Sequence, residues 1–179
     1  MLSGEDYLSA VAIRASRNKG KLYTAPIGPI NAMVANMYAG AGAALGQIHF
    51  CLVAATVPEI NAFVVKDFSS HAAQHARQAT NGVKGMGTLI VTLAGLVSPV
   101  VQPDAIPAAT AKPELDFGAE KRPVVVDLST GQVHMFTGTK FVGLVMQRAI
   151  RKRAQMLFPP PAEAEADLRD NPRPVIPPA

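Results

Sequence analysis

Two short apolar runs on either side of a long amphipathic segment constrain the fold of this chain most. Residues 49–55 and 88–97 are almost continuously apolar, which is typical of strands buried on both faces. Between these runs, apolar residues recur at helical spacing up to about residue 80. A strand, a long helix and a second strand predict a crossover unit that joins two parallel strands.

The start of the long helix is predicted from a capping box. Thr56 is a favourable N-cap residue, Glu59 can reach back to it, and Pro58 is tolerated in the first helical turn. An Asn-Gly pair at residues 81–82 is typical of a helix end. We therefore expect this helix to begin just after Thr56.

Weaker patterns predict the remaining elements. A helix is expected to begin at Ser3, and apolar residues between 30 and 45 repeat at helical spacing. Residues 123–137 are predicted to form a β-hairpin and residues 139–158 a final helix, whereas the segment 98–122 has four prolines and is expected to be a long loop. Together these elements predict an α+β fold, with a mixed sheet of about four strands covered by three or four helices.

The last residues of the chain differ in composition from the rest. Residues 159–179 contain seven prolines and almost no large apolar side chains. Such a segment buries too little apolar surface to offset the entropy lost on ordering, so we expect a disordered, proline-rich and acidic tail. The predicted organisation is one α+β domain at 1–158 followed by this tail.

Charge and cysteine content argue against a secreted, disulfide-linked or membrane-spanning protein. The net charge is +4 and the single cysteine, Cys51, cannot form an intramolecular disulfide, which suits a reducing compartment. The N-terminus carries acids where a signal peptide needs positive charge, so a cytoplasmic location is predicted. Two uncharged stretches, 22–58 and 85–103, are interrupted by prolines and polar residues, and no membrane span is expected.

The most distinctive polar feature is a stripe on the long helix. Asp67, His71 and His75 are spaced i, i+4, i+8, so they lie on one helix face, in line with the apolar residues of the preceding turns. An i, i+4 histidine pair can bind zinc, but a zinc site needs a third ligand, for which the candidates are His49, Cys51 and His134. The residue after His71 is alanine rather than the glutamate of zinc proteases.

The stripe is more simply explained without a metal or a cofactor, and none is predicted. The three side chains then hydrogen-bond at the border of the core, or they mark the edge of a ligand cleft or of an interface. If a cleft is present, we expect it between this face and the 98–122 loop. No Ser, Cys or carboxylate arrangement has the context of a catalytic set, and the glycine-rich segment 82–88 follows a helix rather than opening one, unlike a phosphate loop.

The final predicted helix carries the other candidate surface. Arg148, Arg151 and Lys152 lie on its polar face and could bind anions or the phosphates of nucleic acid. No aromatic residue is interleaved with these cations, which argues against stacking on bases. A solvated polar face on a helix packed against the core explains the same pattern.

The strand HFCLV, the helix after it, and the hairpin PVVVDLSTGQV that leads into a basic helix resemble a family of small uncharacterised bacterial proteins. The resemblance covers about residues 45–158 and implies one α+β domain. That family has no assigned activity or site residues, so the resemblance implies nothing about chemistry.

Three functional hypotheses remain. The first is a non-catalytic cytoplasmic protein that acts through protein–protein interaction as a homo-oligomer, because alanine, glycine and methionine suit close helix packing and adaptable surfaces. The second is a small-molecule-binding protein or enzyme with a cleft beside Asp67, His71 and His75. The third is nucleic-acid binding through the final basic helix.

Overall fold

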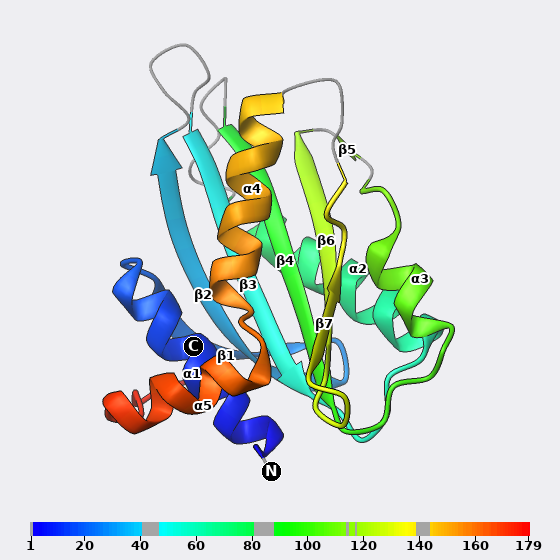
Figure 1. Ribbon diagram of the computed structural model, residues 1–179. Helices are drawn as coiled ribbons and strands as arrows, with labels where there is room; N and C mark the ends of the chain where they lie inside the picture. The colour runs from blue at the N-terminus through cyan, green and yellow to red at the C-terminus, as the bar shows by residue number, and fades with distance from the viewer. Residues whose placement is uncertain (1, 41–46, 81–87, 114, 117, 139–143) are drawn as a thin grey trace.

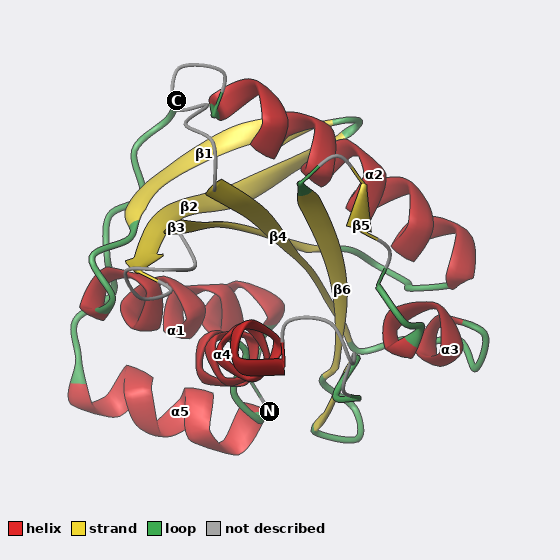
Figure 2. Cartoon of the chain, turned by 90° about the horizontal axis from the view of Figure 1, so that it is seen from above, coloured by secondary structure: helices red, strands yellow, loops and turns green. Residues whose placement is uncertain are grey.

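A computed structural model describes residues 2–179 except 41–46, 81–87, 114, 117 and 139–143. Within these residues, the chain forms an α+β fold in which helices cover both faces of a seven-stranded sheet (Figures 1 and 2). The elements in chain order are α1 (Gly4–Arg17), β1 (Lys21–Ile27), β2 (Ile30–Gly40), β3 (Gln47–Thr56), α2 (Ala62–Ala79), β4 (Thr88–Ser98), α3 (Ala105–Thr110), β5 (Leu115–Asp116), β6 (Ala119–Asp127), β7 (Gln132–Met135), α4 (Leu144–Leu157) and α5 (Pro161–Asp170).

The centre of the sheet is parallel, as the strand–helix–strand pattern predicts. The strand order is β1-β2-β3-β4-β6-β5, and β7 pairs with β6. The pairs β3–β4 and β4–β6 are parallel, while β1–β2, β2–β3, β5–β6 and β6–β7 are antiparallel. The sheet is therefore mixed, with more strands than the sequence predicts.

Two apolar cores lie on opposite faces of the sheet. On one face α1 and α4 pack over Phe50, Leu52 and Leu93, with α5 outside α1. On the other face α2 and α3 pack over Val53 and Leu96. Because both faces of β3 and β4 are covered, their residues alternate between two cores rather than between core and solvent.

The helix predicted between residues 30 and 45 is wrong over residues 30–40, which form strand β2. Met33, Ala35 and Met37 point into one core, and Ala32 and Val34 into the other. A strand buried on both faces is apolar at nearly every position, so apolar residues also occur at helical spacing by coincidence. Residues 41–45 lie outside the described part of the chain.

A two-residue turn fixes the pairing of β2 with β1. Gly28 and Pro29 connect Ile27 to Ile30, which are paired in the register of the hairpin. Gly28 has φ +59°, a conformation that glycine adopts without the steric cost of a Cβ atom.

The predicted start of the long helix is also wrong. Asn61 is the N-cap of α2, and its side chain accepts a hydrogen bond of 2.9 Å from the amide of Val64. The segment after β3 stays extended because Val57 donates a backbone hydrogen bond to Val97 in β4, and Ile60 donates one to Val100 just after β4. The hydroxyl of Thr56 instead donates to the Glu5 carboxylate of α1, at 3.0 Å.

The segment 98–122, expected to be a long loop, contains regular structure. It includes helix α3, the short strand β5 and the first four residues of β6, which begins at Ala119. The hairpin expected at 123–137 is confirmed by the pairing of β6 with β7. Helix α1 also begins as predicted, with the Ser3 hydroxyl accepting a hydrogen bond of 3.1 Å from the amide of Asp6.

The prediction of a disordered tail is wrong. Helix α5 packs on α1, and its Asp167 carboxylate accepts hydrogen bonds from Arg14 at 2.5 Å and from Arg17 at 2.9 Å. Beyond α5, Thr24 in the edge strand β1 exchanges backbone hydrogen bonds with Pro177 and Ala179. The acids and prolines of this segment are therefore used in tertiary contacts, which the composition of the segment alone cannot reveal.

No helix in the described part of the chain is both long and apolar enough to cross a membrane.

Candidate functional site

The polar stripe of α2 lies against the β1–β2 hairpin. His75 has its Nε2 atom 2.9 Å from the hydroxyl of Tyr23 in β1, and the amide of Asn36 in β2 donates to the same hydroxyl at 3.2 Å. The Tyr23 hydroxyl oxygen accepts the hydrogen bond from Asn36, so the hydroxyl hydrogen can be donated to the ring of a neutral His75. Partial burial lowers the pKa of His75, which favours this neutral form.

Asp67 and His71 form a local pair on the same helix. The His71 Nδ1 atom lies 3.4 Å from the Asp67 carboxylate and 3.1 Å from its backbone carbonyl oxygen. The His71 ring also lies over the hairpin turn, because a Cβ atom added to Gly28 would lie only 2.9 Å from His71 Nδ1. The structure thus brings Asp67, His71 and His75 to one side of α2, facing the turn rather than the 98–122 segment.

A hollow of about 180 Å³ lies beside this face, lined by Pro26, Ile27, Gly28, His71, Gln74, His75 and Gln78. It is smaller than the roughly 300–1,000 Å³ of ordinary ligand pockets. One ring nitrogen of His71 and one of His75 already have partners within hydrogen-bonding reach. This geometry provides a hydrogen-bonded border between α2 and the hairpin.

The histidines and the cysteine named as further metal ligands do not converge. No group of three or more His, Cys, Asp or Glu side chains suited to a metal ion occurs among the described residues. Cys51 is buried, and burial raises the pKa of its thiol to about 12, so it is protonated at neutral pH. His49 is 1% exposed and stacks on Tyr38 with ring centroids 4.7 Å apart.

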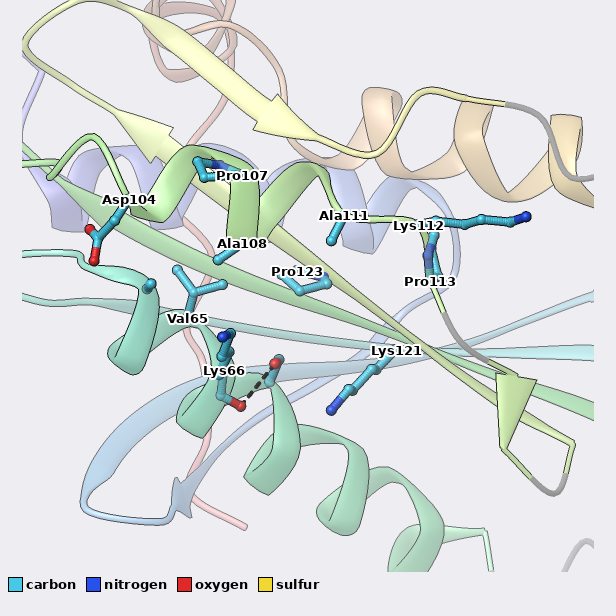
Figure 3. Close-up of a pocket in the computed structure, with 12 residues that line it drawn as sticks. Val65, Lys66, Asp104, Pro107, Ala108, Ala111, Lys112, Pro113, Lys121 and Pro123 are labelled. Carbon is cyan, nitrogen blue, oxygen red and sulfur yellow. Dashed lines mark hydrogen bonds between the residues drawn. The ribbon is translucent and has the colours of Figure 1, made fainter.

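A larger cleft lies on another side of α2, between α2, α3 and β6 (Figure 3). Its volume is about 520 Å³, within the usual range of small-molecule sites. Apolar side chains supply most of its surface, from Val65 on α2, Pro107 and Ala108 on α3, and Pro123 on β6. The full lining is Ala62, Val65, Lys66, Ser69, Asp104, Pro107, Ala108, Ala111, Lys112, Pro113, Lys121 and Pro123.

Three lysines and one acid give this cleft a positive rim. Lys121 extends from β6 toward α2, where its ammonium donates a hydrogen bond of 3.3 Å to the hydroxyl of Ser70. Lys66 stands on the α2 wall, whereas the side chain of Lys112 extends away from the cleft (Figure 3). Asp104 is the single acidic residue among the described residues that line it.

The sequence prediction did not identify the α2 residues that line this cleft, although part of their signal was available. The α2 wall follows a helical spacing from Ala62 through Lys66 to Ser69, on a face different from that of the histidines. The opposite wall lies mostly in the 98–122 segment, which the sequence prediction also placed across a cleft from α2. The prediction named the histidine face of α2 instead of this one, and it did not include helix α3.

The cations of the final helix have different surroundings. Arg148 and Lys152 are exposed on α4, and Arg151 is half-buried with its guanidinium donating to the carbonyl oxygen of Thr137 at 2.9 Å. Arg153 instead donates to Asn18 of α1 and lies over the ring of Phe50. The three residues predicted to bind anions therefore lie on one helix, and none of them lines the α2–α3 cleft or the hollow beside the hairpin.

A buried ionic cluster on the α4 side was also missed. Glu120 and Arg122 are two residues apart on β6, so their side chains lie on the same face of the sheet. The Arg122 Nε atom lies 2.6 Å from Glu120 Oε1. Gln147 of α4 donates to Glu120 at 3.1 Å and accepts a hydrogen bond from Arg122. All three side chains are less than one-tenth exposed, so the pairing satisfies charges that would be costly to bury alone.

Comparison with protein-family models finds no match to this chain, and no similar curated protein is found.

Proposed function

We propose that this protein binds a small, largely apolar molecule in the cleft between α2 and α3. One observation carries the proposal: a hollow of about 520 Å³ has an apolar floor, and its charged groups stand at the rim. Ligand sites in proteins commonly combine an apolar lining with a few polar groups that orient the ligand. The cleft replaces the smaller hollow beside Asp67, His71 and His75 as the preferred site.

The floor of the cleft is supported by the rigid core. Val65 is 2% exposed and lies in the same apolar cluster as Phe68 and Val125, while Ala105 and Ala109 anchor α3 to that cluster. Prolines at positions 107, 113 and 123 restrict the backbone around the opening. A site of this kind is largely formed before its ligand arrives, which lowers the entropy cost of binding.

Titration with the neutral fluorescent probe N-phenyl-1-naphthylamine tests this proposal. We expect a saturable rise in emission at one site per chain. The substitution Ala108→Phe fills the cleft and should abolish the rise, whereas Ala79→Phe, on an exposed position of α2 outside the cleft, should leave it unchanged. A signal that does not saturate, or that is equal in both variants, would refute binding in this cleft.

Self-association of a non-catalytic, cytoplasmic protein is the second candidate. It is favoured by exposed apolar side chains near the same end of α2 and α3, where Phe63 is 74% exposed and Ile106 is 37% exposed. Light scattering should then give a mass above that of one chain, and Phe63→Ser should restore the monomer mass. A wild-type protein that is already monomeric at high concentration would exclude this candidate.

A further inference from the structure

A second hollow lies along α2, beside the α2–α3 cleft. That hollow has a volume of about 260 Å³ and lies between α2 and the beginnings of β4 and β6. Lys121 lines both hollows, so it stands at their junction. The second hollow is lined by Ser70, Ala73, Arg77, Thr92, Ala119, Glu120 and Lys121.

The two hollows differ in chemistry. The described residues that line the cleft include valine, alanines and prolines, and none of them is aromatic. The second hollow begins at the hydrogen bond from the Lys121 ammonium to the Ser70 hydroxyl, and Thr92 and the guanidinium-bearing Arg77 also line it. An apolar cleft thus lies beside a polar hollow whose lining includes two cations, Arg77 and Lys121, and one acid, Glu120.

The aliphatic side chains among the described lining residues indicate the shape of the apolar part of a ligand. Flat rings, such as nucleobases, are commonly bound by stacking on aromatic side chains. An aliphatic lining provides only dispersion and hydrophobic contacts, which suit a flexible hydrocarbon chain equally well at each methylene. At roughly 30 Å³ for each water-sized group, 520 Å³ accommodates a chain of medium length.

Two lysines, Lys66 and Lys121, determine the charge expected at the other end of the ligand. The Lys121 ammonium donates one hydrogen to the Ser70 hydroxyl at 3.3 Å, and that hydroxyl donates its own hydrogen to the Lys66 carbonyl oxygen at 2.8 Å. Lys121 is thereby oriented along α2, and its two other ammonium hydrogens can be donated to an anionic group. Lys66 adds a second positive charge on the α2 wall of the cleft. An anion bound here gains attraction without the cost of a fully buried charge, because Lys66 and Lys121 are exposed.

We propose that the ligand is an unbranched aliphatic chain of medium length that ends in an anion, a carboxylate or a phosphate. The chain lies on the floor formed by Val65, Ala108 and Pro123, and the anion is bound by Lys121, with Lys66 as the second cation. This inference rests on the proposed function of the cleft and adds the chemical class of its ligand.

Competition against N-phenyl-1-naphthylamine tests the ligand class, with decanoate, decyl phosphate and decanol as competitors. At least one of the two anions should displace the probe at a concentration about five- to tenfold lower than decanol, the effect of one charge-assisted contact. Lys121→Met should remove this advantage and leave decanol unchanged. Lys152→Met is the matched control, because that lysine is exposed on α4, on the opposite face of the sheet, and the advantage should persist.

Different results would refute the ligand class and the binding site itself. Displacement by decanol as effective as by both anions, or an advantage that survives Lys121→Met, would overturn the assignment of the anion. Failure of all three decyl compounds to displace a bound probe would overturn the aliphatic class while the cleft remains a binding site. A probe that does not bind to the wild-type protein would instead refute the proposed function. Which anion competes better distinguishes carboxylate from phosphate.

Discussion

Gly95 allows Phe158 to pack against the sheet, and adding one methyl group there should destabilise the fold. A Cβ atom built on Gly95 would lie 2.2 Å from Cε1 and 2.4 Å from Cζ of Phe158, whereas carbon atoms in contact are ordinarily about 3.5–4.0 Å apart. The ring is 1% exposed, so it must move by more than 1 Å within a close-packed core. Phe158 directly follows α4 and precedes the segment that leads to α5.

The expected cost of Gly95→Ala is about 1–3 kcal/mol, the usual range for overpacking a core. For a chain of 179 residues, this corresponds to a fall of roughly 2–4 °C in the melting temperature for each kcal/mol. Urea unfolding followed by circular dichroism measures the change in the free energy of unfolding. Replacing the ring by a shorter side chain, as in Phe158→Leu, should recover part of the loss when it is combined with Gly95→Ala.

A double-mutant cycle tests this contact specifically. The double variant should be more stable than the sum of the two single effects predicts, with a coupling energy of about 1 kcal/mol or more. Gly95→Ala without loss of stability, or strictly additive effects, would refute the packing of Phe158 on this strand.

Two further perturbations test the anchoring of α5 and the buried histidine. Asp167→Asn should lower the free energy of unfolding by about 1–3 kcal/mol, because this mostly buried carboxylate accepts hydrogen bonds from two arginines; Glu163→Gln, whose side chain is 61% exposed, should cost less than about 1 kcal/mol. Equal effects in urea unfolding would contradict the docking of α5. Burial lowers the pKa of His49 from its ordinary value of 6.5. As the pH falls through 6.5, the unfolded chain therefore binds a proton at this residue more readily than the folded chain, and the free energy of unfolding should decrease. His49→Phe should reduce this slope, and an unchanged slope would show that His49 is not buried as described.

The parts of the fold that could be predicted are those with local or periodic signals. The runs at 49–55 and 88–97 are apolar throughout because both faces of β3 and β4 are covered, and they flank one long helix. The same property made β2 unpredictable. Its residues between 30 and 40 satisfy a helical pattern as well as a strand pattern, and only pairing with β1 and β3 decides between the two.

Long-range partners account for the other errors. Asp167 pairs with Arg14 and Arg17, about 150 residues earlier in the chain, and no composition argument identifies those partners. Thr56 satisfies the rule for an N-cap, but its hydroxyl is bonded to Glu5 of α1. Local propensity is a weak prior where tertiary contacts offer a better alternative.

In the candidate site, too, the local spacing of residues could be predicted and their long-range neighbours could not. The helical spacing of Asp67, His71 and His75 correctly places them on one face of α2, but which element lies opposite depends on the β1–β2 hairpin. The cleft depends on the helix α3 and on the position of Lys121 in β6, which begins four residues earlier than the predicted hairpin.

Intermolecular nuclear Overhauser effects provide the most direct test of small-molecule binding in the α2–α3 cleft. With N-phenyl-1-naphthylamine bound to methyl-labelled protein, we predict effects between the probe and the methyl groups of Val65 and Ala108, which line the cleft. Effects confined to methyl groups outside the cleft, such as those of the exposed Val175, would contradict the account.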